Sequence, residues 1–324
     1  EYDKIIEQLA AKASSPMGKR LCQKLTPSCD LKEIETMQTQ TKDALSRIFQ
    51  KGSISFHKVK DIKGSLKRLE IGSTLGIREL LSICAVLENT AKVKAYGRSD
   101  REDQEADSLE PMFQLLEPLT PLSTEINRCI LSEEEISDDA SPGLKQVRRN
   151  MKNTNDRIHG QLNSLLNGSA RSYLQDGVIT MRNGRYCLPV KAEYKNQVPG
   201  MIHDQSSTGS TLFIEPMSVV KLNNDLRQLE VQEQKEIEIV LSNLSEQAAQ
   251  YLDALRDDLD ILIQLDFIFA RASLALDQNA SKPDFNTDGI INLKKARHPL
   301  IHKKQVVPID IRLGGEFDLL VVTG

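Results

Sequence analysis

One stretch decides the fold class of this sequence: residues 217–282, MSVVKLNNDLRQLEVQEQKEIEIVLSNLSEQAAQYLDALRDDLDILIQLDFIFARASLALDQNASK, contain neither Gly nor Pro over 66 positions. Apolar residues recur every three or four positions from Leu222 to Leu262, and Glu233 interrupts the series. That spacing is typical of an amphipathic helix. A continuous helix of this length spans about 100 Å, at ~1.5 Å per residue. The simplest interpretation is one long helical arm with an apolar seam, and the alternative is an arm that is broken into shorter helices.

A second seam starts upstream, at Leu144. Its apolar residues recur every seven positions, with two more in the second seam position: Leu144, Met151, Ile158, Leu165, Val147 and Leu162. A heptad pattern over three to four repeats is typical of a coiled-coil seam. We expect residues 144–174 to pair with the 217–282 helix and to run in the opposite direction.

The residues between the two seams, 176–215, are the only strongly β-like part of the chain. Asn183-Gly184 supplies the two positive-φ positions of a type I′ hairpin turn. Two hairpins are expected, with strands at 178–182 and 185–190, and at 201–204 and 210–214. These strands should form a small β-containing tip on a helical stalk.

The remaining segments complete a mainly α fold. Near the N-terminus, Ser15-Pro16 and Asp30 with Glu33 are helix-start signals. Near the other end, short apolar runs at 290–293, 306–307 and 319–322 predict the first strands of an α/β domain. The expected organisation is a helical core (1–143), an ascending helix with the β tip (144–216), a long returning helix (217–282) and an incomplete α/β domain (283–324).

Composition agrees with a helix-rich, soluble protein. Gly and Pro together make 29 of 324 residues, aromatic residues make 4 %, and 27 % of residues are charged. These values argue against a β-sandwich, and 39 % hydrophobic residues argue against disorder. The five cysteines are odd in number and form no C-x-x-C pair, so we expect reduced thiols. No signal peptide or membrane-spanning run is recognisable, which predicts a cytoplasmic protein.

The charge is segregated along the chain. The net charge is −4 overall, which by itself argues against nucleic acid as a partner. Resolved by segment it is −10 over 98–142, +7 over 144–201 and −6 over 217–282. A basic tip suits the phosphate backbone of nucleic acid, because Lys and Arg release counterions when they neutralise phosphates. The predicted phosphate-binding residues are Lys145, Arg148, Arg149, Lys152, Arg157, Arg171, Arg182, Arg185, Lys191 and Lys195.

Two groups of residues resemble catalytic or metal sites without meeting their requirements. His203, Asp204 and Ser206 are neighbours in sequence, but a Ser-His-Asp triad is assembled from distant segments and no G-x-S-x-G elbow occurs. His298 and His302 are four residues apart, but the intervening Pro disfavours the helix that would align them for zinc. We assign no catalytic residue and no metal ligand.

Residues Leu319-Leu320-Val321-Val322-Thr323-Gly324 form an apolar run that ends in Gly. A phosphate-binding loop, G-x-x-x-x-G-K-[ST], begins in this way after a buried strand. Gly324 is therefore the predicted first residue of a nucleotide-binding loop.

Four stretches carry a resemblance to a known family: GRYCLPVK at 184–191, HDQSSTGSTLFIEP at 203–216, ARHPL at 296–300 and LVVTG at 320–324. Together and in this order they resemble the second bacterial paralogue of the MutS family. The resemblance covers essentially the whole chain. It implies a core and lever of long helices, a clamp at the tip, and the start of an ATPase domain.

The resemblance also implies an activity and partners. Full-length members bind ATP and Mg²⁺, form homodimers and carry a C-terminal Smr nuclease domain. They act on branched DNA to suppress homologous recombination, or on collided ribosomes through ribosomal RNA. The Walker lysine, the Mg²⁺ ligand and the Walker B acid would all follow Gly324. We therefore expect this chain alone neither to bind ATP and Mg²⁺ well nor to hydrolyse ATP.

Two details depart from the wider family. Phe213-Ile214-Glu215 matches the Phe-x-Glu pattern by which mismatch-repair MutS wedges into a mispair, but there the pattern lies in an N-terminal domain that this chain lacks room for. We expect Phe213 to pack internally. Where the family often stacks an aromatic residue on adenine, this sequence has Val306-Val307, which argues against that contact.

Two alternatives belong to other classes. One is a non-enzymatic coiled-coil scaffold that dimerises and whose basic stretch is only a solvated face. The other is a helical spacer from a chromosome-maintenance ATPase.

Overall fold

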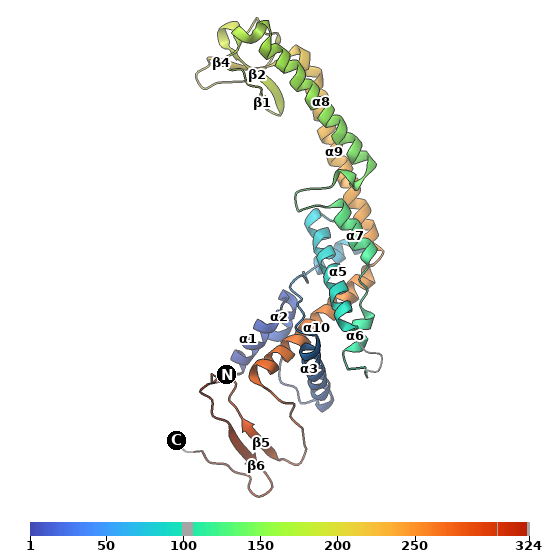
Figure 1. Cartoon of the computed structure of the whole chain (residues 1–324), viewed down its shortest axis with the longest axis vertical. Coiled ribbons are helices and arrows are strands. Elements are labelled where there is room, and N and C mark those ends of the chain that lie inside the picture. The colour runs from blue at the N-terminus through green and yellow to red at the C-terminus, as the bar shows by residue number, and fades with distance from the viewer. Residues whose placement is uncertain (99–105, 303, 323–324) are drawn as a thin grey trace. The chain divides into compact units, whose positions relative to one another are not determined.

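The computed structural model describes residues 1–98, 106–302 and 304–322 (Figure 1). The protein is mainly α, as predicted, with two small antiparallel sheets. The chain divides into two compact units. The first contains Glu1–Ser73, Glu79–Ser123 and Ala248–Gly324, and the second contains Thr74–Arg78 and Thr124–Gln247.

Helices build most of the first unit. They are α1 (Tyr2–Lys12), α2 (Pro16–Gln23), α3 (Leu31–Lys51), α4 (Lys63–Glu70), α5 (Ile77–Gly97), α6 (Glu110–Leu115) and α10 (Leu252–Gln278). α10 packs against α1, α2, α3, α4 and α6. Aromatic rings fill the space between these helices: Phe269 of α10 lies 6.1 Å from Phe56 and 5.7 Å from Tyr96, measured between ring centroids.

The two predicted helix starts are confirmed. The Ser15 hydroxyl accepts a hydrogen bond from Gly18 N and caps α2, whose first residue is Pro16. Buried Asp266 of α10 fixes the same cap, because its carboxylate accepts hydrogen bonds from Ser15 N and Ser15 Oγ. Asp30 caps α3 through two backbone N–H groups. A side chain of this kind satisfies donors that the first helical turn leaves unpaired.

The C-terminal strands differ from the prediction. β5 (Ile291–Ala296) and β6 (Ile309–Leu313) form a two-stranded antiparallel sheet. The expected strands at 306–307 and 319–322 are absent. Val307, Leu319 and Val322 are 73 %, 77 % and 84 % exposed, and no neighbouring strand pairs with them among the described residues. β-propensity alone does not make a strand when no sheet receives it.

The second unit contains the helix pair that the two seams predict. α8 (Pro142–Asn167) lies beside α9 (Met217–Ala249) in Figure 1. The two helices are antiparallel: Ile158 and Leu162 share a core with Leu222 and Leu226, whereas Arg148, nearer the start of α8, contacts Glu233. Short elements complete the unit: η1 (Asp138–Ala140), η2 (Ser169–Tyr173) and η3 (Ala192–Tyr194), with α7 (Thr120–Cys129) crossing from the first unit.

A four-stranded antiparallel sheet lies between α8 and α9 in sequence, and both predicted hairpins are confirmed. Its strands are β1 (Thr180–Arg182), β2 (Arg185–Lys191), β3 (Gly200–Gln205) and β4 (Thr211–Pro216), in the order β1-β2-β4-β3. Asn183 and Gly184 have φ values of 52° and 72°, as a type I′ turn requires. The pairing of β3 with β4 shifts between Ile202 and Asp204, so His203 forms a bulge.

One face of this sheet is buried against the helix pair. Leu188, Val190, Leu212 and Ile214 share a core with residues of α8 and α9. Alternate residues along each strand face the opposite side. The polar residues considered below, from Arg185 to Glu215, therefore lie on the other face or at the ends of the strands.

The 66-residue run without Gly or Pro is not one helix. α9 ends at Ala249 and α10 begins at Leu252, because the backbone of Tyr251 leaves the helical region with φ −114° and ψ 24°. Each helix buries its apolar side in its own unit: α9 packs with α8 and the sheet, and α10 packs among the helices of the first unit. Tertiary packing therefore overrides a local sequence that favours continuation.

Two further properties concern the whole described chain. Within residues 1–98, 106–302 and 304–322, no helix has the length and apolar character needed to cross a membrane. All five cysteines are free thiols. Burial raises the pKa of Cys22 and of Cys187 to about 11, which keeps both thiols protonated near neutral pH.

Candidate nucleic-acid interface

The ten basic residues predicted to bind phosphate all lie in the second unit, and the structure separates them into two groups. Four form ion pairs within the unit: Lys145, Arg148, Arg182 and Arg185. The other six form no ion pair with any residue the structure describes: Arg149, Lys152, Arg157, Arg171, Lys191 and Lys195. Only the second group offers positive charge that the protein itself does not compensate.

Arg148 links three parts of the unit. Its Nε donates to Glu233 of α9 at 2.7 Å, and its Nη1 donates to Asp138 and to the Ile136 carbonyl, both at 2.6 Å. Its side chain is 25 % exposed and that of Glu233 is 20 % exposed. The pair accounts for the polar residue that interrupts the seam of α9. We therefore expect Arg148 to stabilise the helix pair rather than to bind phosphate.

The other α8 cations are exposed. Lys145 pairs with Asp139, but the two side chains are 66 % and 70 % exposed, and such pairs contribute little. Arg149 and Lys152 follow Lys145 by four and seven residues, so the three share one face of the helix. Arg157 lies about 140° further round the helix from Lys152, at 100° per residue. The structure thus gathers three of the four exposed α8 cations and separates the fourth.

At one end of the sheet, cations are bound internally around the carboxylate of Glu215, which has no solvent exposure. Arg185 Nη1 donates to both Glu215 oxygens, at 2.7 and 3.0 Å. His203 Nε2 lies 2.6 Å from Glu215 Oε2, and Asn223 of α9 donates to Oε1 at 2.7 Å. We call this group, together with Arg182, the Glu215 end of the sheet.

Arg182 is also engaged within the Glu215 end. Its guanidinium lies 4.0 Å above the Phe213 ring and 3.2 Å from the Asp204 carboxylate. Phe213 is half-buried beneath it, in agreement with the expectation that this ring packs internally. A cation over an aromatic face is stabilised by the ring quadrupole. The charges of Arg182 and Arg185 are therefore both matched by carboxylates of the same sheet.

The opposite end of the sheet is different. Tyr173 of η2 and Tyr194 of η3 lie in contact, with ring centroids 5.2 Å apart and planes at 40°. Lys191 Nζ is 6.0 Å from the centre of the Tyr194 ring and donates to the Ser172 carbonyl at 3.4 Å. Arg171 and Lys195 flank the two rings in sequence and are exposed. We call these five residues, with the loop 206–210, the Tyr194 end.

The loop 206–210 carries hydroxyl groups. It closes the hairpin of β3 and β4 through Ser206 N, which donates to Thr211 O at 2.9 Å, and through Gly209 at φ 71°. The Thr208 hydroxyl lies 3.4 Å from that of Ser206 and 2.8 Å from that of Ser210. Ala192 N donates to Ser210 O at 2.9 Å, which places the loop beside η3.

Sequence reasoning missed His203 and Asn223 as ligands of Glu215. The signal was a Glu within the apolar run 211–216, because a buried carboxylate requires donors. Its donors come from separate segments, so the sequence does not identify them. His203, Asp204 and Ser206, which resembled a hydrolase site, make separate structural bonds: His203 with Glu215, Asp204 with Arg182, and Ser206 with Thr211.

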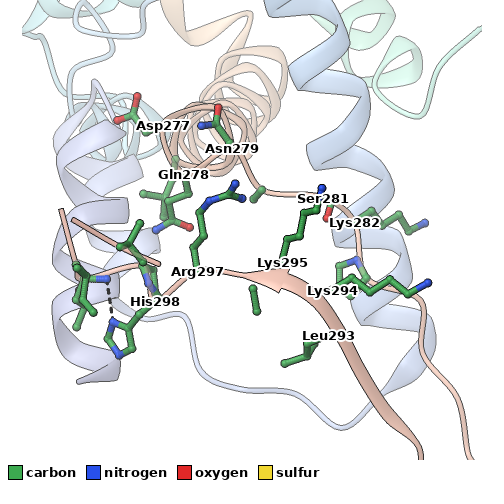
Figure 2. Close-up of a pocket in the computed structure, with 18 of the residues that line it drawn as sticks. Asp277, Gln278, Asn279, Ser281, Lys282, Leu293, Lys294, Lys295, Arg297 and His298 are labelled. Carbon is green, nitrogen blue, oxygen red and sulfur yellow. Dashed lines mark hydrogen bonds between the residues drawn. The ribbon is translucent and has the colours of Figure 1, made fainter. Parts of the chain in front are cut away.

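A cavity of about 1390 Å³ lies in the first unit, between the end of α10 and residues 280–302. In Figure 2 the side chains of Lys295 and Arg297 extend towards the end of α10. Asn279 and Lys295 both adopt left-handed backbone conformations, with φ 48° and 50°. Gln278 Nε2 is buried there and has no hydrogen-bond partner among the described residues.

The lining of this cavity has some of the groups that a nucleotide site requires. Lysines and Arg297 suit an anion, and Phe285 and Val306 supply apolar walls. The predicted phosphate loop starts at Gly324, which lies outside the described residues, so the ATP and Mg²⁺ expectation stays a prediction. His298 and His302 each accept a backbone N–H from their own turn, at 3.3 Å. They stabilise local turns in this arrangement.

Comparison with known proteins identifies relatives along the whole chain. No family model matches it. The chain is 54 % identical over 325 residues to the endonuclease MutS2 of Agathobacter rectalis. It is 55 % identical over 330 residues to the endonuclease MutS2 of Lachnoclostridium phytofermentans, and 44 % identical over 324 residues to that of Caldanaerobacter subterraneus subsp. tengcongensis.

Each of these matches covers all of this chain and 41–42 % of the relative. The chain therefore spans about two fifths of the length of the curated relatives. The four stretches that suggested the MutS resemblance lie within the matched region, since the match extends over the entire chain. By this similarity the chain belongs to the MutS family, in the branch of the MutS2 proteins.

Proposed function

We propose that this chain is the nucleic-acid-engaging part of a MutS-type ATPase. In this proposal α8 and α9 form the lever, the four-stranded sheet forms the clamp, and the helices of the first unit form the core. Residues 283–324 begin the ATPase domain, whose ATP and Mg²⁺ ligands follow Gly324. The whole protein is proposed to act in the cytoplasm as a homodimer.

The observation that carries the proposal is the group of six cations, from Arg149 to Lys195, that form no ion pair with any residue the structure describes. Cations of this kind bind phosphates and release counterions, which gives affinity without reading the base sequence. The relatives are named endonucleases, so they act on polynucleotides. Branched DNA, in the suppression of homologous recombination, and the ribosomal RNA of collided ribosomes both present dense phosphate.

A coiled-coil scaffold is the second candidate. Arg148, Arg182 and Arg185 support it, because their contacts within the unit give part of the basic stretch a structural role. Val231 and Ile239 of α9 are 52 % and 50 % exposed and could contact a second copy. In this case the six cations that form no ion pair with described residues would serve only solubility.

Salt dependence separates the two candidates. We would titrate the chain with a labelled four-way DNA junction and, separately, with ribosomes at several salt concentrations. The test variant reverses Arg149, Lys152 and Arg157 to Glu, and the control reverses Lys221 and Lys235 on α9. If the proposal is right, affinity falls steeply with salt, and the test variant binds more weakly, with a slope reduced by about 0.9 per lost duplex phosphate contact.

The control should retain most of its affinity, and circular dichroism should show that both variants are folded. Binding that is independent of salt and equal in all three proteins would support the scaffold instead.

A further inference from the structure

The Tyr194 end, which includes the loop 206–210, has a combination of groups that the Glu215 end lacks. Arg171, Lys191 and Lys195 make no ion pair with any described residue, whereas Arg182 and Arg185 at the Glu215 end are both matched by carboxylates. The nearby acids, Asp176 and Glu193, are exposed. This end therefore retains positive charge that an anionic partner can neutralise.

The two tyrosines are held in place before any partner arrives. Tyr173 and Tyr194 are half-buried and pack against the core that α8, α9 and the sheet share. Their rings contact each other at 5.2 Å. Rings fixed in this way lose little conformational entropy when another flat group stacks on them. Aromatic rings beside cations are the usual platform for unpaired bases.

The loop adds hydrogen-bonding groups at the same place. Ser207 and Thr208 are exposed, and the bond from Ala192 N to Ser210 O holds the loop against η3. Ser and Thr hydroxyls are common donors to phosphate oxygens. Cations, hydroxyls and half-exposed rings thus lie together at one end of the sheet.

We propose that the Tyr194 end binds unpaired nucleotides of RNA or DNA. In this arrangement Lys191, Lys195 and the loop hydroxyls contact phosphates, and a base stacks on the tyrosine pair. A base pair inside a duplex is covered on both faces by its neighbours, so an unpaired base can stack here and an internal paired base cannot. The inference rests on the proposed function and specifies which part of a branched or folded nucleic acid the clamp binds.

The test compares labelled hairpins that contain an unpaired loop with duplexes in which the same nucleotides are paired, in RNA and DNA versions. The variants are Tyr194→Leu, which keeps a large apolar side chain against the core, and Lys195→Glu. The matched control is Arg149→Glu with Lys152→Glu on α8. Circular dichroism verifies that each variant is folded. Tyr194→Phe is a further variant that keeps the aromatic ring, and it is compared with Lys195→Glu if Tyr194→Leu does not fold.

We expect Tyr194→Leu to weaken binding of the unpaired loops about tenfold, the effect of losing one base–aromatic stack, and to leave duplex binding unchanged. Tyr194→Phe should bind the loops like the wild type. The α8 control should bind both the unpaired loops and the duplexes more weakly than the wild type does. RNA and DNA loops that respond equally would show that the shared base and phosphate chemistry is recognised, and an RNA-only response would add a contact to the 2′-hydroxyl.

Equal binding of unpaired loops by wild type, Tyr194→Leu and Lys195→Glu would overturn the inference. If the α8 control still weakened binding in that case, the proposed function would stand. If the wild-type chain bound none of the nucleic acids, both would fail.

Discussion

The two ends of one small sheet use the same residue types in opposite ways. At the Glu215 end, Arg185 and Arg182 are matched by Glu215 and Asp204 and contribute to folding. At the Tyr194 end, Lys191 and Lys195 have no such partner among the described residues. The four cations lie within fourteen residues of sequence. A local charge count therefore measures how much charge is present but not how much of it is available to a ligand.

The strongest test of this difference removes the carboxylate of Glu215. Glu215→Ala would leave the Arg185 charge and the donors of His203 and Asn223 without their acceptor. Breaking a buried ion pair by removing one partner typically costs about 3–5 kcal/mol of stability. Urea denaturation followed by circular dichroism should show a loss of this size.

The matched control is Glu193→Ala, which removes an exposed carboxylate from η3 near the other end. Its effect should stay within about 0.5 kcal/mol, as for most surface substitutions. A Glu215→Ala variant as stable as this control would contradict the structural role assigned to the Glu215 end.

A buried carboxylate without a cation sharpens the comparison. Asp258 of α10 is 1 % exposed, accepts a hydrogen bond from Glu117 N at 2.8 Å, and forms no ion pair with the described residues. Burial raises its pKa from 3.8 to about 7. Between these two pH values the folded chain keeps a proton that the unfolded chain has lost. Stability should therefore fall by about 1.4 kcal/mol per pH unit as the pH rises through this window, and level off above it.

Asp258→Asn should remove this dependence. Its stability relative to wild type should increase from pH 4 to pH 7, measured by urea denaturation at several pH values. Asp257→Asn, at an exposed neighbouring position, is the control and should show no such trend. A constant difference between Asp258→Asn and wild type would refute the buried, proton-binding role of Asp258.

The smallest effects are expected on α8, where a bound and a free cation lie four residues apart. Arg148→Met would lose hydrogen bonds to two carboxylates and a carbonyl, at a cost of about 2 kcal/mol, and should leave nucleic-acid binding nearly unchanged. Lys152→Met should do the reverse, weakening binding and leaving stability within about 0.5 kcal/mol. Fluorescence anisotropy and urea denaturation measure the two properties. If both variants lost stability and binding to the same extent, the division into structural and phosphate-binding cations would be wrong.

Local features of the fold were predictable from the sequence. The Asn183-Gly184 turn, the Ser15 cap and the seam from Leu144 depend on residues close in the chain, and all three are confirmed. The position of the break at Tyr251 was not predictable, because no Gly or Pro marks it and the two helices pack in different units. The strand expected at 319–322 failed for a related reason, since pairing partners decide whether an apolar run becomes a strand.

The candidate site was predictable only in part. Its location on α8 and the sheet follows from the charge pattern. The sequence does not show which of these cations form internal ion pairs. Arg148 pairs with Glu233, 85 residues away, and Arg185 pairs with Glu215, 30 residues away. Pairings at such distances are determined by the fold and leave no local signal.

The bulge at His203 has a consequence for how the protein behaves at high concentration. The sheet has two outer strands: β1 is three residues long, and β3 carries the bulge. A long, regular outer strand exposes N–H and C=O groups that can add a strand from another molecule, and a short or interrupted one does so poorly. Met201 and Ile202, on β3, are 51 % and 53 % exposed, so a regular β3 would present an apolar edge. The backbone irregularity that brings His203 to Glu215 therefore also protects the chain against edge-to-edge aggregation.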